Sequence, residues 1–532
     1  MLSACYLIRI MMQKYKKKLK EWKKVLLLFV LILLFCMLLR VGRVLADQQS
    51  VFGDEAIYIR WAQVMRAEPG LRFLPLSDGK QPLFMWALMP VLKVVTNPLF
   101  AGRLLSVLSG VGTLLGVFCL TYLLFSSKEV ALFASFIYTL SPFAVFFDSM
   151  ALVDSMLSLF GIWTFIFALV AVKYYRFDFA MLAGFSLGGA LLTKSPAVFF
   201  SILTPSVIVF SKWPKDISRK VTHALKLFAI FIPTYLIGYG MYNILRLGVN
   251  FHLISERNKD YIFPISHLFT NPKDPFIFHV KEIINWIWLL GPGILLLFIL
   301  LGLIIGIRKY RKQTLIISLW VALPLFINSM YAKVFTARYI YYVLPYIFIL
   351  SSVFIFSRYA KSLIFKLLIL AFVAISLYYN YLLIFNLPSA KLPKNERSGY
   401  LEEWTAGYGI KEVAEYLRGK VVSVSAGKQI VVGTEGYFGT LPDGLQMYLA
   451  DVPQITVIGV GLDIKALPQS LQESKDFGNS TYLVINNSRL KADPQSLGLK
   501  LIASYPKPLR TTENKEYYLY GPQEVLYFFE VE

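Results

Sequence analysis

The stretch Val25–Leu39, with the sequence VLLLFVLILLFCMLL, contains no charged residue and decides the class of the fold. Two further runs, Leu104–Phe125 and Ile294–Ile307, are also apolar. Together with their flanking residues, runs of this kind are long enough as helices to cross a hydrocarbon core of about 30 Å. They predict an α-helical polytopic membrane protein.

The composition agrees with this class. Of the 532 residues, 57% are hydrophobic and only 16% are charged, whereas soluble proteins carry about 25% charged residues. The net charge of +22 is spread over short basic clusters between apolar runs rather than gathered on one face. Such clusters set the orientation of membrane spans, so we expect no nucleic-acid partner.

Apolar runs predict about eleven transmembrane helices, and the short runs 179–192 and 197–211 are candidates for half-buried or broken helices. The predicted spans are 25–45, 100–125, 130–147, 152–172, 179–192, 197–211, 222–246, 284–307, 314–331, 338–357 and 362–386.

A basic segment, residues 1–24, precedes the first run and contains the cluster Lys14–Lys24. This resembles the start of a signal peptide, but no convincing small-residue cleavage site follows. We therefore expect an uncleaved first helix. If the N-terminus is cytoplasmic, nearly every short basic loop falls on the cytoplasmic side. The prediction is a multi-pass plasma-membrane protein.

Two long loops, 47–99 and 247–283, would then lie outside the cell and belong to a transmembrane catalytic domain over 25–390. Both contain aromatic and apolar stretches typical of the membrane interface.

The chain changes character at about residue 391, where charged residues and turn signals become frequent. Short β-branched runs and one helical pattern predict a soluble, extracytoplasmic α/β domain over 391–532. The runs are Val421–Val424, Ile430–Val432 and Tyr482–Ile485, and the helical pattern covers Gly409–Leu417.

Ionisable residues near membrane depth are costly and therefore informative. In the predicted topology, the ionisable residues near membrane depth in this chain all lie at the outer face. Their common position indicates one polar site. They are Asp54, Glu55, Lys80, Asp148, Asp154, Lys194 and Arg338.

Asp54 and Glu55 open a segment whose apolar and polar residues alternate as in an amphipathic interfacial helix. Asp54 can be read as the N-cap of this helix or as a carboxylate that takes a proton from an attacking hydroxyl. The two interpretations are compatible. For Asp148 and Asp154, capping of helix ends is the alternative to a place in the site, and Asp154 is the stronger candidate.

Three cations form the second part of the pattern. Lys80 and Lys194 each stand two residues before a proline and an apolar run, and free N–H groups at the start of a helix attract anions. Arg338 can add a forked phosphate contact. A single lysine of this kind is readily explained as an interfacial cation that extends its amine to water. Three on one face beside carboxylates favour anion binding.

Oxygen ligands from Asp54, Glu55 and Asp154 could also hold a divalent cation, although no spacing rule supports this set. We expect no obligatory cofactor.

The ordered motifs resemble glycosyltransferase family 39 of the GT-C superfamily, which includes protein O-mannosyltransferases and lipid A aminoarabinose transferases. The resemblance covers roughly residues 25–350. It rests on Asp54-Glu55-Ala56, Lys80-Gln81-Pro82-Leu83, Leu152-Val153-Asp154-Ser155, Leu192-Thr193-Lys194-Ser195-Pro196, and Arg338-Tyr339 leading to Leu344-Pro345. The family usually shows Lys-Pro-Pro and Thr-Lys-Gly-Pro, so the chain departs from the pattern at Gln81 and Ser195.

This resemblance implies an inverting transfer of a hexosyl or pentosyl group from a polyprenyl-phosphate donor to a protein, lipid or glycan in the cell envelope. Asp54 would be the general base, and Glu55 and Asp154 would shape the catalytic site. The leaving phosphate would be held by Lys80, Lys194 and Arg338.

Two other functions are compatible with a membrane protein of this composition. One is a transporter or flippase of anionic isoprenoid lipids, but no internal repeat is visible and the polar residues gather at one surface. The other is a membrane anchor whose soluble domain carries the activity, but residues 391–532 show no nucleotide, metal or nucleophile motif.

Overall fold

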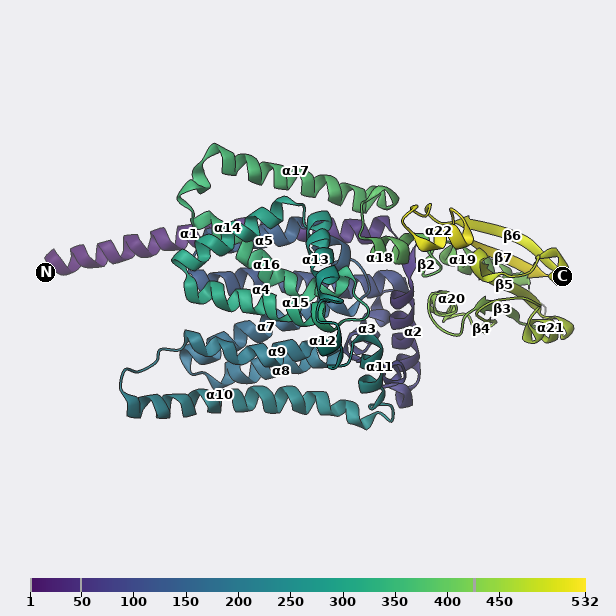
Figure 1. The fold of residues 1–532 in the computed structure, drawn as a ribbon, viewed down its shortest axis with the longest axis horizontal. Helices are drawn as coiled ribbons and strands as arrows, with labels where there is room; N and C mark the ends of the chain where they lie inside the picture. The colour runs from purple at the N-terminus through teal and green to yellow at the C-terminus, as the bar shows by residue number, and fades with distance from the viewer. Residues whose placement is uncertain (1, 48–49, 424–426) are drawn as a thin grey trace.

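The structure, a computed structural model, describes residues 2–47, 50–423 and 427–532. A bundle of helices is followed along the long axis by a domain that contains a β-sheet (Figure 1). The N-terminal half of α1 projects from one end of the molecule, and the C-terminus lies at the other. The predicted fold class is confirmed.

Apolar helices form the bundle, and most of them run roughly along its length, whereas α13 lies across it (Figure 1). They are α1 (Leu2–Ala46), α4 (Pro98–Phe125), α5 (Lys128–Leu140), α6 (Pro142–Asp148), α7 (Val153–Tyr174), α8 (Phe177–Thr193), α9 (Val198–Leu203), α10 (Ile217–Asn243), α13 (Phe276–Leu290), α14 (Ile294–Lys309), α15 (Arg311–Tyr331), α16 (Leu344–Ser352) and α17 (Leu363–Phe385).

Seven helices in the described part of the chain are long and apolar enough to cross a membrane, or nine if each of two bent pairs is one span. The predicted spans 179–192 and 197–211 correspond to the shorter apolar segments Phe177–Thr193 and Ser195–Phe210. Multiple apolar helices of this kind make the chain a multi-pass membrane protein.

Two predicted spans are not continuous helices. The span 130–147 bends by 62° between α5 and α6, because Pro142 lacks a backbone N–H and disfavours helical geometry at Ser141. The span 284–307 bends by 112° between α13 and α14, at the sequence Gly291-Pro292-Gly293. Such bends cannot be predicted from hydropathy alone, because the apolar run continues through them.

The predicted helix at Asp54 is α2 (Gly53–Ala67). It runs across the end of the bundle that faces the C-terminal domain (Figure 1). Most of its residues are buried, since it packs against α3 (Leu83–Val94), α4 and the C-terminal domain. The apolar face of α2 is thus covered by protein, and its place at the membrane interface stays a prediction. The second of the predicted outer loops, 247–283, contains α11 (Leu253–Tyr261) and α12 (His267–Thr270).

The C-terminal domain contains a five-stranded sheet in the order β4-β3-β5-β7-β6. β3 pairs in parallel with β4 and β5, while β7 pairs antiparallel with β5 and β6. Every residue of β3 is buried, as expected of a central parallel strand. The strands are β3 (Ile430–Glu435), β4 (Ile455–Gly461), β5 (Ser480–Asn486), β6 (Leu499–Pro506) and β7 (Val525–Val531).

This domain also contains the short helices α19 (Ile410–Lys420), α20 (Asp443–Leu449), α21 (Gln469–Asp476) and α22 (Lys515–Tyr520). The runs Ile430–Val432 and Tyr482–Ile485 lie in strands, as predicted. Val421–Val424 does not fit its prediction, because Val421–Ser423 forms a 3-10 turn after α19 and residue 424 lies outside the described residues.

The bundle and the C-terminal domain are joined directly at the start of α2. There β1 (Val51–Phe52) pairs antiparallel with β2 (Ala406–Gly407), and the Gly53 amide donates to the Thr405 carbonyl oxygen at 3.1 Å. This pairing fixes the position at which α2 begins.

Candidate active site

Asp54 contacts two of the predicted cations. Its carboxylate oxygens lie 3.3 Å from Lys80 Nζ and 2.5 Å from Arg338 Nη1. All three side chains remain between 17% and 21% exposed. The N-cap of α2 is Phe52, so Asp54 stands at the second helical position and its side chain is directed into an ion-pair cluster rather than into a cap.

Lys80 is held in a tight loop that leads into α3. Gly79 has a left-handed backbone (φ 63°), and a Cβ there would come within 2.6 Å of the Leu253 carbonyl oxygen, so only glycine fits. The Lys80 ammonium lies 3.2 Å from Asp78 Oδ2 and 5.0 Å from the ring centroid of Tyr58. The lysine is thus fixed by carboxylates and an aromatic face together.

A second ion pair joins Asp154 to Lys194, with 2.7 Å between Oδ1 and Nζ. Asp154 lies in the first turn of α7, and Lys194 follows the last turn of α8 in extended conformation. Lys194 Nζ lies 4.6 Å from the ring centroid of Tyr339, and Arg338 Cζ lies 5.3 Å from the same centroid. Tyr339 therefore connects the two ion pairs into one cluster.

Opposite charges control the protonation of this cluster. Burial alone would raise the pKa of the Asp54 carboxyl, but Lys80 and Arg338 outweigh it and hold that pKa well below its usual range. Burial likewise disfavours the charged Lys80, yet Tyr58 and Asp54 raise its pKa above the ordinary value. Asp54 and Lys80 are consequently both charged at neutral pH.

Glu55 is not part of this cluster. Its carboxylate is fully buried and pairs with Arg103 on α4, with Nε–Oε1 at 2.8 Å and Nη2–Oε2 at 2.9 Å. It also accepts from the amides of Ala151 and Phe52, at 2.7 Å and 3.0 Å. These bonds satisfy both oxygens and anchor α2 to the bundle. The glutamate at the third helical position, typical of a capping box, was the available sequence signal for this role.

The three carboxylates considered as metal ligands are not brought together. Asp54 and Asp154 each pair with a different lysine, and Glu55 pairs with Arg103. Over the described ranges, no group of three His, Cys, Asp or Glu side chains is close enough to hold a metal ion.

Asp148 serves a structural network below the site. It accepts hydrogen bonds from Arg40 at 2.8 Å, Tyr138 at 2.7 Å, Ser155 at 2.8 Å and Tyr341 at 2.6 Å. Tyr341 stands in the same 3-10 segment, Ala337–Val343, as Arg338. Asp148 thereby fixes that segment to the bundle. Arg40, a charge at the end of the first apolar run, was a signal that the sequence reasoning missed.

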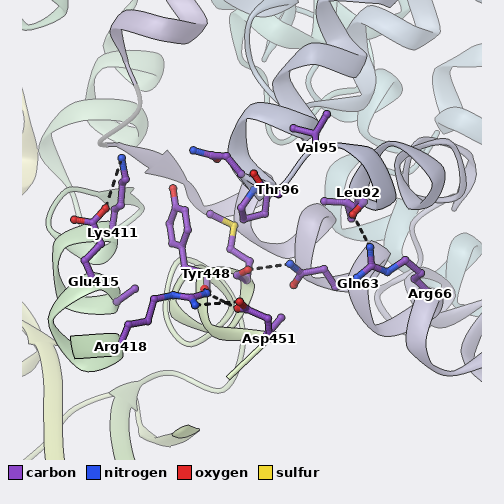
Figure 2. A pocket seen from close by; sticks show the side chains of 15 residues that line it. Gln63, Arg66, Leu92, Val95, Thr96, Lys411, Glu415, Arg418, Tyr448 and Asp451 are labelled. Carbon is purple, nitrogen blue, oxygen red and sulfur yellow. Dashed lines mark hydrogen bonds and ion pairs between the residues drawn. The ribbon is translucent and has the colours of Figure 1, made fainter. Parts of the chain in front are cut away.

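A cavity of about 610 Å³ lies between the bundle and the C-terminal domain (Figure 2). Gln63 lines it and follows Asp54 by nine residues, which places the two on opposite sides of α2. Its charged lining residues pair with one another or with backbone: Lys411 with Glu415, Arg418 with Asp451, and Arg66 with the Leu92 carbonyl. The cavity is therefore separate from the Asp54 cluster.

A family model described as dolichyl-phosphate-mannose-protein mannosyltransferase matches residues 79–237. This range includes Lys80, Asp154 and Lys194. Among curated proteins, none matches the sequence.

Solved structures of low sequence identity share the fold. ArnT from Cupriavidus metallidurans bound to undecaprenyl phosphate is 15% identical with a TM-score of 0.58, covering 94% of this chain and 97% of that chain. The apo state of the same protein gives 15% identity and a TM-score of 0.58 over 96% and 98% of the two chains. The arabinofuranosyltransferase AftD from Mycobacteria is 12% identical with a TM-score of 0.52, over 94% of this chain and 40% of that chain.

These comparisons confirm the resemblance that the motifs predicted. The chain shares the fold of ArnT and AftD, and its residues 79–237 match the mannosyltransferase family model.

Proposed function

We propose that the chain is an inverting glycosyltransferase, which moves a sugar from a polyprenyl-phosphate donor to an acceptor hydroxyl on the extracytoplasmic membrane face. The observation that carries this proposal is the contact of one carboxylate, Asp54, with two cations, Lys80 and Arg338, at 3.3 Å and 2.5 Å. A proton acceptor and a phosphate-binding charge thus share one partly open site.

Donor binding is the first step. The phosphate brings negative charge to Lys80, Arg338 and Lys194, and Arg338 can bind it with its planar fork. The match to a polyprenyl-phosphate-bound relative, ArnT with undecaprenyl phosphate, supports this type of donor. Fixed cations also stabilise the phosphate as it leaves.

Asp54 then acts as the general base. When the phosphate draws Lys80 and Arg338 toward itself, the effect that depresses the Asp54 pKa weakens, and the carboxylate becomes a stronger proton acceptor. It takes the proton of the acceptor hydroxyl, whose oxygen bonds to the anomeric carbon from the face opposite the phosphate. The bond from that carbon to the phosphate oxygen breaks, and polyprenyl phosphate leaves. One displacement inverts the anomeric centre.

The distribution of basic loops supports a cytoplasmic N-terminus. In that orientation this cluster and the C-terminal domain would lie outside the plasma membrane. A divalent cation is not required by these steps, and transfer measured with and without EDTA tests that expectation.

The decisive experiment measures transfer of radiolabelled sugar from defined polyprenyl-phosphate donors to a cell-envelope extract. We expect Asp54→Asn to lose roughly 100-fold or more of the rate while still binding polyprenyl phosphate. Asp476→Asn, on the exposed face of α21, is the matched control and should transfer at the wild-type rate. Full activity of folded Asp54→Asn would refute the proposal. Passage of lipid across sealed vesicles without transfer would instead support the transporter.

A further inference from the structure

The segment that follows the last membrane helix reaches back to the residue before Arg338. Here α18 (Lys394–Arg397) places the Glu396 carboxyl 2.6 Å from the Ala337 amide, which donates to Oε1. Beside it, Asn395 Nδ2 donates to the Phe335 carbonyl oxygen at 3.3 Å. Two consecutive residues of α18 thus hold the backbone on the N-terminal side of Arg338.

Glu396 occupies this position at an energetic cost. The residue is only 2% exposed, and its Oε2 atom has no hydrogen-bond partner among the described residues. Burial raises the pKa of this carboxyl to about 7, although the Ala337 amide and Arg338 act in the opposite direction. Costly buried acids of this kind concentrate at functional sites.

The same segment also holds the Asp54 side of the cluster. Its strand β2 pairs with β1, and the Thr405 carbonyl oxygen accepts from the Gly53 amide at 3.1 Å. The Tyr400 ring lies 4.2 Å from the Phe52 ring, centroid to centroid. Residues 394–407, which we call the brace, therefore contact the backbone next to both partners of the Asp54–Arg338 ion pair.

The brace is itself fixed to the C-terminal domain. Glu403 accepts from Arg510 Nε at 2.9 Å, and Glu402 accepts from Asn514 Nδ2 at 3.0 Å. Arg510 and Glu403 are almost fully buried, so this attachment is rigid rather than a surface contact. The C-terminal domain is thereby linked mechanically to the cation that faces Asp54.

We propose that Glu396 is a positioning residue, which holds the Ala337 backbone so that Arg338 meets the donor phosphate opposite Asp54. This inference rests on the proposed function and assigns to the C-terminal domain the task of supporting the donor site. Loss of the Glu396 hydrogen bond should weaken donor binding before it affects the proton transfer by Asp54.

The experiment compares Glu396→Ala, Glu396→Gln and the exposed control Glu513→Ala as full-length chains in lipid nanodiscs. Binding of undecaprenyl phosphate and the donor KM are measured separately from kcat. We expect Glu396→Ala to weaken binding and raise KM about tenfold, near the upper limit for the loss of one hydrogen bond. Glu396→Gln keeps an acceptor oxygen and should restore binding to within about twofold of wild type.

Two outcomes would overturn the inference. One is wild-type binding of undecaprenyl phosphate by Glu396→Ala. The other is an equal loss of binding in Glu396→Ala and Glu396→Gln that is proportional to the loss of folded protein. Failure of the proposed function is a distinct result, because it appears as no transfer by wild type with any donor. In that case weaker undecaprenyl-phosphate binding by Glu396→Ala, with rescue by Gln, would still support the positioning role.

Discussion

The side-chain amide of Gln81 donates a hydrogen bond to the hydroxyl of Ser195, with 2.9 Å between Nε2 and Oγ. These are the two positions at which the chain departs from the Lys-Pro-Pro and Thr-Lys-Gly-Pro patterns of the family it resembles. Each stands next to a predicted phosphate-binding lysine, Lys80 or Lys194. The two departures therefore meet in space, and their bond joins the two loops that carry these cations.

The first prediction concerns this bond. Gln81→Ala and Ser195→Ala should each raise the donor KM about two- to tenfold, because a hydrogen bond of this kind contributes roughly 0.5 to 1.5 kcal/mol. The donor KM of the double variant should be no higher than that of the more affected single variant, since the same hydrogen bond is lost in all three. Gln469→Ala, exposed on α21, is the control. Additive losses in the double variant would show that the two residues act independently.

Lys80 and Lys194 should affect the affinity for the donor more than the rate of sugar transfer. Lys80→Met and Lys194→Met are expected to raise the dissociation constant for polyprenyl phosphate about tenfold or more, because each removes a charge next to the phosphate. Lys93→Met tests the alternative of a simple interfacial cation, as Lys93 is exposed at the end of α3. Binding by equilibrium titration should leave this control within about twofold of wild type. Equal effects in all three variants would argue against a specific phosphate site.

The buried pair Glu55–Arg103 should matter for stability. Removing one partner leaves the other charge buried and unpaired, at a cost of roughly 3 to 5 kcal/mol, so Glu55→Gln and Arg103→Met should unfold at markedly lower temperature. Thermal unfolding in detergent measures this, with Asp54→Asn as the comparison. A Glu55→Gln variant of wild-type stability but without transfer would place Glu55 in the reaction after all.

Glu396 should also make stability depend on pH. Its pKa is about 7 in the folded protein and about 4.3 in an unfolded chain, so folding favours its protonated form. The resulting stabilisation is fully present below about pH 4 and is lost as the pH rises through 7, where Arg338 and Tyr400 face the ionised carboxylate. Relative to wild type, Glu396→Gln should gain up to roughly 3 kcal/mol between pH 5 and pH 8. If Glu396→Gln and wild type differed in stability by the same amount at pH 5 and at pH 8, this prediction would be contradicted.

Part of the site was predictable because its residues have local signals. Lysines two residues before Pro82 and Pro196, and carboxylates at the start of apolar helices, can be recognised within a few positions of sequence. The predicted topology places them on one side. The structure brings Asp54, Lys80 and Arg338 into contact and Asp154 and Lys194 into a second pair.

The remainder depends on long-range contacts that leave no local pattern. Glu55 is adjacent to Asp54 in sequence, but its partner Arg103 comes from a different helix, so adjacency did not reveal its separate role. Asp148 ends α6, where a capping residue is expected, but its partners come from α1, α5, α7 and the segment before α16. A two-residue strand such as β1 has no detectable periodicity, and neither it nor Glu396 was expected.

The pairing of β1 with β2 has a consequence for how the protein is made. Residue 51 leaves the ribosome long before residue 406, which follows the apolar helix α17 in the chain. Contacts so distant in sequence are slow to form, and during synthesis the N-terminal partner has to wait for the C-terminal one. The backbone next to Asp54 is therefore fixed only after residue 407 has been synthesised. A ribosome that stops before that point releases a chain in which α2 lacks this support from β2.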